Sequence, residues 1–262
     1  MKKVFVVSDI HSFHSIFYSE LIKNGFDINN KNHILIVCGD PFDRGDESKE
    51  LLDFLLSIPK ERLILIRGNH DDLMLDLLKH LKNKTNFDMA HWSNGTLKTV
   101  EHLTGINKYD LLYGIYDYNI HIKKKLNNYF KLMKQSVDYY ELGNYIFVHG
   151  WVPFVYEDRF PEEGIGAYCV PVINLKASKD MWESARWKNG MECARQGITI
   201  PGKTIVCGHW HTGYGHCHIL KTCTDEDECF DIYYNDGIIA LDACTVLSNK
   251  VNVLVLEIDD DK

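Results

Sequence analysis

Five apolar runs rich in β-branched residues are each followed directly by a short polar motif. The runs are Val4–Val7, Ile34–Cys38, Leu63–Ile66, Tyr145–Val148 and Thr204–Cys207. Runs of this length and composition predict buried strands. In an open α/β sheet, ligands bind beyond the carboxyl ends of the strands, which is where the polar motifs fall. The pattern therefore predicts one site that is assembled from five segments.

The five polar motifs carry side chains that suit metal ions. The candidate ligands are Asp9, His11, Asp40, Asn69, His149, His209 and His211. Mixed imidazole, carboxylate and amide ligation fits Mn, Fe, Zn, Co or Ni better than calcium, which prefers oxygen alone. Seven ligands are more than a single four- to six-coordinate ion needs. We therefore expect a pair of divalent transition-metal ions.

The spacing within two motifs gives expectations about local geometry. One residue separates Asp9 from His11, so in an extended segment both side chains would point to the same side. Pro41 disfavours the helical region for Asp40, which we expect to lie on an extended strand end. From there its carboxylate is a candidate bridge between two cations about 3.5–4 Å apart.

The first 80 residues alternate strand and helix. Apolar spacing predicts helices over Phe13–Asn24, Glu47–Ser57 and Asp72–Leu81. Asp9, Asp40 and Asn69 follow one another at intervals of roughly 30 residues, the length of a βαβ unit. The first three strands are therefore expected to be parallel neighbours.

The later part of the chain is predicted to be less regular. Residues 85–135 have a helical pattern in which we identify little chemistry. Tyr139–Val148 is typical of a hairpin with a turn at Gly143-Asn144, and a helical pattern lies near Lys179–Ala194. Ile238–Leu241 and Val251–Ile258 are predicted to form a second hairpin. We expect one α/β domain over residues 1–262, with two sheets face to face and with residues 85–135 and 151–200 inserted around the active site.

Composition limits the partners and the compartment. A net charge of −8 argues against broad nucleic-acid binding, which needs Lys and Arg to neutralise phosphates. A small phosphate substrate remains compatible, because divalent cations reverse the local field. No apolar run approaches the about 20 residues of a membrane span, and no signal peptide precedes the first strand. We expect a cytoplasmic protein. Cys217, Cys223 and Cys229 match no compact zinc-site spacing.

Taken together, the five motifs resemble those of the calcineurin-like metallophosphoesterases. The sequence Asp43-Arg44-Gly45 is similar to the phosphoprotein phosphatase branch, whose bacterial relatives include serine/threonine protein phosphatases and diadenosine-tetraphosphate hydrolases. Ser12 stands where the family often has glycine, and Asp71 where protein phosphatases more often have Glu. The resemblance implies a four-layer α/β/β/α sandwich of two mixed sheets flanked by helices, with a two-metal site.

The resemblance also implies roles for single residues. One ion would lie on Asp9, His11, Asp40 and His211, and the other on Asp40, Asn69, His149 and His209. His70 would be the general acid for the leaving oxygen, and Asp43 would orient it. Arg44 would bind phosphate oxygens together with a second arginine, for which we choose Arg186 over Arg159 and Arg195.

Three functions from two classes are compatible with these residues. The leading hypothesis is a phosphoesterase that hydrolyses phosphate monoesters by attack of a metal-bridging hydroxide, with phosphoserine or phosphothreonine as candidate substrates. An alternative is hydrolysis of dinucleoside polyphosphates or phosphodiesters. A non-catalytic metal-binding scaffold is a remote alternative, and the retained pair of His70 and Asp43 weighs against it. Manganese is the metal that we expect first.

Overall fold

The strands form two sheets and one separate pair in the computed structural model, which describes residues 2–159 and 168–258. The strands are β1 (Lys2–Val7), β2 (His33–Cys38), β3 (Leu63–Ile66), β4 (Tyr140–Leu142), β5 (Tyr145–Phe147), β6 (Phe154–Arg159), β7 (Tyr168–Ile173), β8 (Thr204–Cys207), β9 (Tyr233–Asn235), β10 (Ile238–Ala240) and β11 (Leu254–Ile258). One sheet has the order β11-β1-β2-β3 and the other β4-β5-β8-β10-β9, while β6 pairs with β7.

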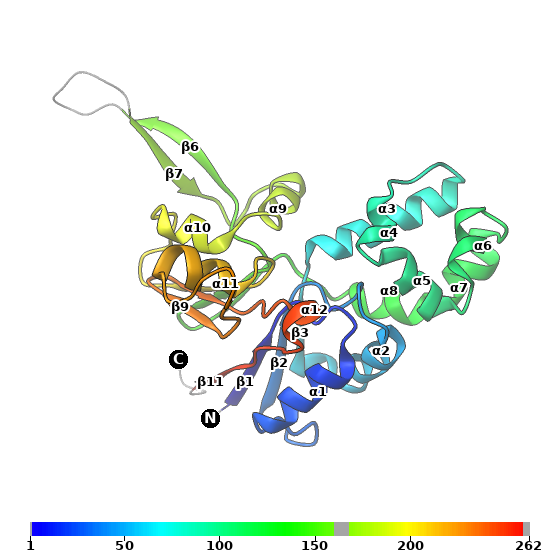
Figure 1. Ribbon diagram of the computed structural model, residues 1–262, viewed down its shortest axis with the longest axis horizontal. Helices are drawn as coiled ribbons and strands as arrows, with labels where there is room; N and C mark the ends of the chain where they lie inside the picture. The colour runs from blue at the N-terminus through cyan, green and yellow to red at the C-terminus, as the bar shows by residue number, and fades with distance from the viewer. Residues whose placement is uncertain (1, 160–167, 259–262) are drawn as a thin grey trace.

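Helices cover the outer faces of the two sheets (Figure 1). They are α1 (His14–Lys23), α2 (Ser48–Ser57), η1 (Lys60–Arg62), α3 (Asn69–Asn83), α4 (Ala90–Ser93), α5 (Thr96–Thr104), α6 (Lys108–Leu112), η2 (Tyr118–Ile122), α7 (Lys123–Lys125), α8 (Asn127–Met133), α9 (Lys179–Ala185), α10 (Gly190–Arg195), α11 (Thr212–Tyr214), η3 (Gly215–Leu220) and α12 (Thr245–Ser248).

Strand alternation explains why there are four layers. In β1, Val4 and Val6 point into an apolar cluster between the two sheets, whereas Phe5 and Val7 point into the cluster beneath the helices. In β8, Val206 joins the layer between the sheets, and its neighbours on either side face the second helical layer. Because both faces of inner strands such as β1 and β8 are buried, the sheets must be covered on both sides. The predicted α/β/β/α sandwich of two mixed sheets is confirmed.

The N-terminal half follows the predicted order. β1, β2 and β3 are parallel neighbours, with Val6 opposite Ile36 and Val37 opposite Leu65. The expected helices correspond to α1, α2 and α3. However, α3 begins at Asn69 rather than at Asp72. Asn69 and the next residue therefore lie in the first turn of a helix, where the helix dipole is positive.

The predicted C-terminal hairpin is wrong. β10 pairs with β8 and β9 in one sheet, whereas β11 pairs antiparallel with β1 in the other. The chain crosses between the sheets through residues 241–253. Asn252 is buried in this crossing, and its side-chain amide donates to the carbonyls of Phe230 and Leu241, at 2.8 and 3.1 Å. The predicted hairpin of β4 and β5 is confirmed.

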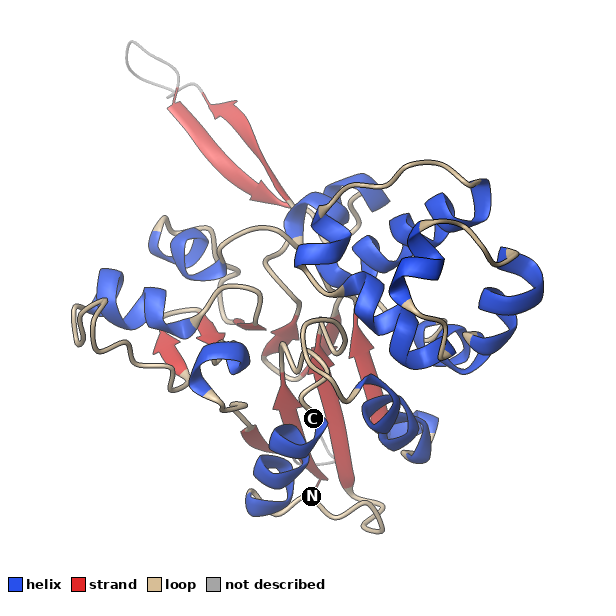
Figure 2. Cartoon of the chain, turned by 45° about the vertical axis from the view of Figure 1, so that its right-hand side comes forward, coloured by secondary structure: helices blue, strands red, loops and turns tan. Residues whose placement is uncertain are grey.

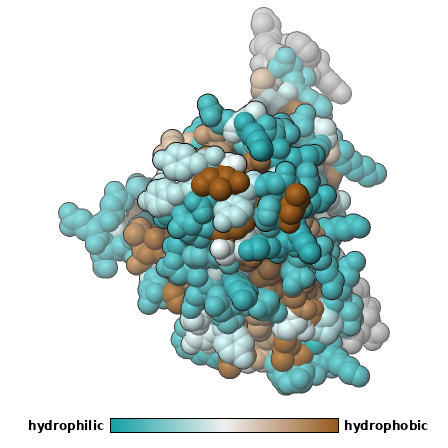
Figure 3. All heavy atoms as spheres, turned by 90° about the vertical axis from the view of Figure 1, so that its right-hand side faces the viewer, coloured by the Kyte–Doolittle hydropathy of each residue, from teal (hydrophilic) through white to brown (hydrophobic). Residues whose placement is uncertain are grey.

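Residues 85–135 are helical, as predicted, and form the group of helices α4–α8 beside α3 (Figures 1 and 2). The face on this side of the molecule is mostly hydrophilic, with isolated hydrophobic residues (Figure 3). In residues 151–200 the sequence analysis missed the hairpin of β6 and β7, which projects from the rest of the protein (Figure 1). Within the described ranges, no helix has the length and apolar character needed to cross a membrane.

We expect Asn252→Ala to destabilise the protein by about 1–3 kcal/mol, because two buried carbonyls would lose their donor. The free energy of unfolding is to be measured by urea denaturation. Asn128→Ala, at an exposed position of α8, serves as the control and should change it by less than about 0.5 kcal/mol. Equal stability of the two variants would show that the crossing does not depend on this amide.

Candidate active site

The carboxyl ends of strands from both sheets meet at one place. Two groups of potential metal-binding side chains lie there, each with its donor atoms within 4.8 Å of one another. His11, Asp40 and His70 form the first group, and Asp40, His149 and His209 form the second. Asp40 belongs to both, as a bridging ligand must. Four predicted ligands are thus brought together, with His70 beside them.

Asn69 and Asp9 lie next to these groups. The Asn69 side-chain oxygen is 2.7 Å from His149 Nε2, and that nitrogen is 3.2 Å from Asp40 Oδ2. Asp9 Oδ1 is 3.8 Å from His11 Nε2, and Asp9 Oδ2 accepts a hydrogen bond from the backbone N–H of His209. The amide and the carboxylate therefore face the same centre as the histidines.

His211 is a predicted ligand that, like Asp9 and Asn69, lies outside both donor groups. Its ring centre is 6.4 Å from that of Phe230. It interacts electrostatically with the buried carboxyl of Asp242, which also interacts with Asp9. Asp242 follows β10 and is 3% exposed. The sequence analysis missed it, although it has the same signal as the others, an acidic residue after an apolar strand.

The backbone at the site is left-handed rather than extended. Asp9 and His11 both have φ of 50°, Asp40 has 52° and His209 has 68°. The expectation of extended geometry at Asp9, His11 and Asp40 is therefore wrong. Residues with a side chain at Cβ rarely adopt positive φ, and such strain concentrates at functional sites. β1, β2 and β8 are therefore each followed by a sharp turn that redirects the side chains beyond the strand.

Two glycines allow the ligands to approach closely. A Cβ atom on Gly68 would lie 1.9 Å from Asp40 Oδ1, and one on Gly208 would lie 2.1 Å from Asp9 Oδ2. Neither distance is compatible with a side chain. Only glycine fits at these two positions, because a carboxylate occupies the space that a side chain would need.

His70 and Asp43 form the pair expected of an oriented acid. His70 Nδ1 lies 2.8 Å from Asp43 Oδ2, and the other ring nitrogen, Nε2, lies 4.0 Å from Asp40 Oδ2. Burial alone would lower the pKa of His70, but the Asp40 and Asp43 carboxylates outweigh burial and raise it. The hydroxyls of Thr96 and Thr99 donate to Asp43, at 2.8 and 2.7 Å. Both threonines come from α5, in the segment where the sequence indicated little chemistry.

The two predicted phosphate-binding arginines lie in different environments. Arg44 is exposed, and its Nη2 is 3.4 Å from His70 Nε2. Arg186 is only 2% exposed, and its guanidinium donates to Asp72 at 2.7 Å and to Asp138. The backbone of Arg186 packs against Gly150, beside the ligand His149. Phosphate binding by Arg186 stays a prediction, since the guanidinium would have to leave an acidic partner to bind phosphate.

The protonation of the site suits bound cations. Burial and the neighbouring His149 lower the pKa of His209 to about 3, so its imidazole is neutral, as a metal ligand must be. Burial would also lower the pKa of His149, but Asp40 and Asp9 outweigh it and raise that pKa to about 10. A proton on His149 thus balances the carboxylates without metal. A metal ion would replace that proton and supply the positive charge itself.

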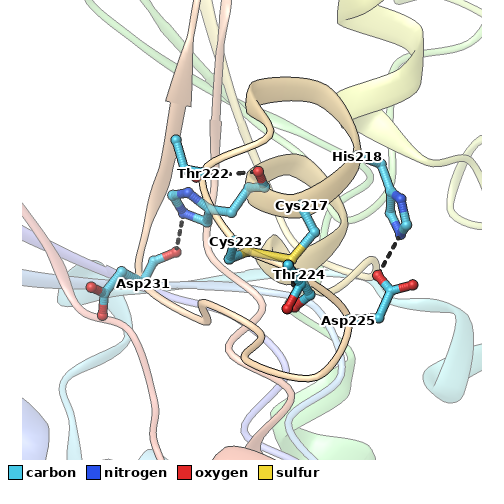
Figure 4. Close-up of a disulfide and its surroundings, with 8 residues drawn as sticks. Cys217, His218, Thr222, Cys223, Thr224, Asp225 and Asp231 are labelled. Atoms are coloured by element: carbon cyan, nitrogen blue, oxygen red, sulfur yellow. Dashed lines mark hydrogen bonds and ion pairs between the residues drawn. A yellow bond between two sulfur atoms is a disulfide. The ribbon is translucent and has the colours of Figure 1, made fainter.

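A disulfide lies just beyond the His209-Trp210-His211 motif. Cys217 and Cys223 are bonded, so η3 is tied to the loop that follows it (Figure 4). The spacing of these cysteines, which excludes a compact zinc site, gave no prediction of this bond. Disulfides persist mainly in oxidising compartments. The bond is therefore unfavourable to the expected cytoplasmic location. That location stays an untested prediction.

A model of the calcineurin-like phosphoesterase family matches residues 2–213, so the chain belongs to that family. The resemblance drawn from the five motifs is confirmed, and the protein is a hydrolase of phosphoric ester bonds. No curated protein matches the chain.

Three solved structures resemble this one. A protein assigned as a diadenosine tetraphosphatase is 14% identical, with 97% of this chain and 89% of that chain covered and a TM-score of 0.51. A cold-active protein tyrosine phosphatase of a Shewanella species is 14% identical, with 98% and 76% covered and a TM-score of 0.51. A serine/threonine phosphatase from Saccharomyces cerevisiae is 12% identical, with 100% and 81% covered and a TM-score of 0.50. At these identities the likeness shows the fold alone.

We expect Gly68→Ala to displace the Asp40 carboxylate, to reduce bound Mn(II) at saturation, and to lower kcat about a hundredfold by misplacing the site. Elemental analysis after gel filtration measures the metal, and circular dichroism checks the fold. Gly105→Ala is the control, because its Cβ would meet open space at φ of +65°. It should lose about 1 kcal/mol of stability to backbone strain and keep its metal. Wild-type metal content in Gly68→Ala would contradict this geometry.

Proposed function

We propose that the protein is a phosphoesterase with two divalent transition-metal ions that share Asp40. The observation that carries the proposal is that one buried carboxylate belongs to both donor groups. One ion would be held by Asp9, His11, Asp40 and His211, and the other by Asp40, Asn69, His149 and His209. Manganese is the expected metal, and iron, zinc, cobalt or nickel would also suit these ligands. When bound, two such ions activate a water near neutral pH and neutralise phosphate oxygens.

The chain's own residues would handle the proton and the phosphate. Asp43 accepts from Nδ1 of His70, so Nε2 would hold the proton that the departing oxygen needs. Burial would lower the pKa of His70, but the Asp40 and Asp43 carboxylates raise it above its ordinary value, which favours the protonated form. Arg44 lies beside the same nitrogen, and its guanidinium would bind the phosphate oxygens with two parallel hydrogen bonds.

The metal site acts on the phosphoryl group, which monoesters and phosphoanhydrides have in common. Phosphate monoesters, with phosphoserine or phosphothreonine among them, remain the first substrate class to test. Dinucleoside polyphosphates and phosphodiesters are the alternative. The scaffold hypothesis is weakened by the hydrogen bonds that Thr96 and Thr99 make to Asp43, since a scaffold would not need an oriented acid. We expect neither membrane binding nor broad nucleic-acid binding.

We expect His70→Ala to lower kcat on phosphoserine about a hundredfold to ten-thousandfold, because a serine alkoxide needs a proton to leave. Hydrolysis of 4-nitrophenyl phosphate should fall much less, since nitrophenolate leaves without one. Metal content is measured in parallel, because His70 lies beside the donor atoms of His11 and Asp40. His121→Ala, at an exposed position of η2, is the control.

Equal losses on both substrates would show that His70 is not the acid. Absence of hydrolysis by the wild-type protein with each of the five metals would contradict the proposed function as a whole.

We expect Arg44→Lys to weaken inhibition by inorganic phosphate about tenfold, the effect of one lost charge-assisted hydrogen bond, with the metal content unchanged. The inhibition constant is to be measured with 4-nitrophenyl phosphate. Arg186→Lys is measured alongside, together with its free energy of unfolding. A matching loss of phosphate inhibition would support phosphate binding by Arg186. Unchanged inhibition with lower stability would instead assign Arg186 to the ion pairs with Asp72 and Asp138.

A further inference from the structure

Four charged side chains form a chain of ion pairs beside the metal-binding groups. Asp72 Oδ1 lies 2.7 Å from Nη2 of Arg67, and Asp72 Oδ2 accepts from Nη1 of Arg186 at 2.7 Å. The other end of the Arg186 guanidinium donates to Asp138. We call Arg67, Asp72, Arg186 and Asp138 the ion-pair chain. Its two arginines and two aspartates alternate, so each charge lies beside one of opposite sign.

The centre of the ion-pair chain is shielded from solvent. The Arg186 side chain is 3% exposed and that of Asp72 is 12% exposed. Salt screens such a pair much less than an exposed one. Removing one partner of a buried pair is unfavourable, because the other charge is then left uncompensated. Since Asp72 contacts both arginines, it is the residue that keeps the two guanidinium groups together.

Asp72 connects the ion-pair chain to the start of α3. It lies in the helix that begins at Asn69, about one turn after that residue. Arg67 lies between β3 and α3, and its backbone N–H donates to the Val137 carbonyl at 2.9 Å. The pair of Arg67 with Asp72 therefore holds the start of α3 against a backbone that is itself fixed. Asn69, a proposed metal ligand, takes its position from this helix start.

Arg186 extends the ion-pair chain to the end of α9, which packs against the residues after His149. The Ala185 carbonyl accepts from the backbone N–H of Trp151 at 3.0 Å. A Cβ atom on Gly150 would lie 2.5 Å from the Arg186 carbonyl oxygen, so the two backbones are in close contact. His149 directly precedes Gly150, and a shift of α9 would therefore shift this ligand.

The residue after Arg186 contacts a second histidine ligand. The Trp187 backbone makes a hydrogen bond with the His209 imidazole, and the two rings lie edge-on with 5.6 Å between their centres. Partners that hydrogen-bond a metal-binding imidazole fix its orientation. The position of Arg186 therefore also affects the orientation of His209.

We propose that Asp72 is a positioning residue for one of the two ions, which we call the second ion. Asn69, His149 and His209 are the ligands proposed for that ion alone, and the contacts of the ion-pair chain lead to all three. Asp72 acts through the start of α3 and through Arg186, without touching the metal. This role rests on the proposed two-ion site. Its loss would loosen the second ion and spare the first.

The test measures binding of Mn(II) to metal-free protein, with unbound Mn(II) followed by electron paramagnetic resonance. The wild-type protein is expected to bind two ions. Asp72→Ala should weaken one of the two binding steps about tenfold to a hundredfold, the usual effect of losing a partner that orients metal ligands, and should leave the other step unchanged. Asn69→Ala removes a proposed ligand of the second ion and gives the reference pattern. In the double variant the two losses should combine to less than their sum, because Asp72 acts partly through Asn69.

Asp76→Ala is the matched control, because Asp76 also lies on α3 and also forms an ion pair, with His91 at 3.1 Å. It should leave both binding steps unchanged. Asp72→Asn keeps the shape of the side chain and loses its charge, so it should weaken the same step by a smaller factor than Asp72→Ala. Circular dichroism checks the fold, and Asp72→Asn is the deciding variant if Asp72→Ala does not fold.

The outcomes separate this role from the function on which it rests. Lower thermal stability of the Asp72 variants with wild-type binding of both ions would overturn the role and leave the proposed function intact. Equal weakening of both binding steps would overturn it as well, because it would reflect a general loosening of the site. Wild-type protein that binds fewer than two Mn(II) ions would contradict the two-ion site of the proposed function and, with it, the role of Asp72.

Discussion

A single buried carboxylate, that of Asp40, is the constraint on which the site depends. It is 1% exposed, and a carboxylate buried so deeply must be compensated by hydrogen bonds and positive charge. Asp40 Oδ1 accepts from the backbone N–H of His70 at the start of α3, and Oδ2 faces His149 from the second sheet. The Asp40 carbonyl accepts from the N–H of His11, after β1. Asp40, at the end of β2, thus contacts residues that follow β1, β3 and β5, and so links the two sheets at the site.

The layers on either side hold this arrangement in place. Positive φ is unfavourable for the site residues that adopt it. The surrounding packed sheets and helices must therefore hold the backbone in this conformation. The helices of residues 85–135 contribute directly, because Thr96 and Thr99 fix the carboxylate of Asp43, which in turn fixes His70. The inserted helices therefore determine the orientation of the proposed acid. A loss of packing around α5 would weaken the hydrogen bonds from Thr96 and Thr99 to Asp43, and would thereby loosen the orientation of His70.

The sequence predicted the features that depend on the spacing of apolar residues and on the place of polar motifs after them. Apolar runs that each end in a polar motif led to β1, β2 and β3 as parallel neighbours and to four residues of the two donor groups. The sequence could not predict that the chain crosses between the sheets from β10 to β11. Both segments are apolar, and the polar residues Ser248-Asn249-Lys250 between them are typical of a hairpin turn. The role of Thr96 and Thr99 was missed, because no spacing or motif in the sequence marks a threonine whose buried hydroxyl donates to a site residue. The left-handed φ at Asp40 was missed because the effect of Pro41 on its neighbour is a preference that tertiary contacts override.

The residues proposed for the chemistry and the residues that line the neighbouring cavities come from different parts of the chain. The residues that could hold metal lie on strand ends, which two packed sheets make rigid, and the proposed centre would act on the phosphoryl group alone. Other segments line the cavities beside the site: Trp92 and Lys108 come from the helices of residues 85–135, and Trp210 comes from the loop after β8. Arg44 belongs to both parts, since its Nη2 lies 3.4 Å from His70 Nε2 and its side chain lines the same cavity as Trp92. If Arg44 binds the phosphate as proposed, it would hold the substrate beside the proposed acid, so binding and protonation would depend on one another.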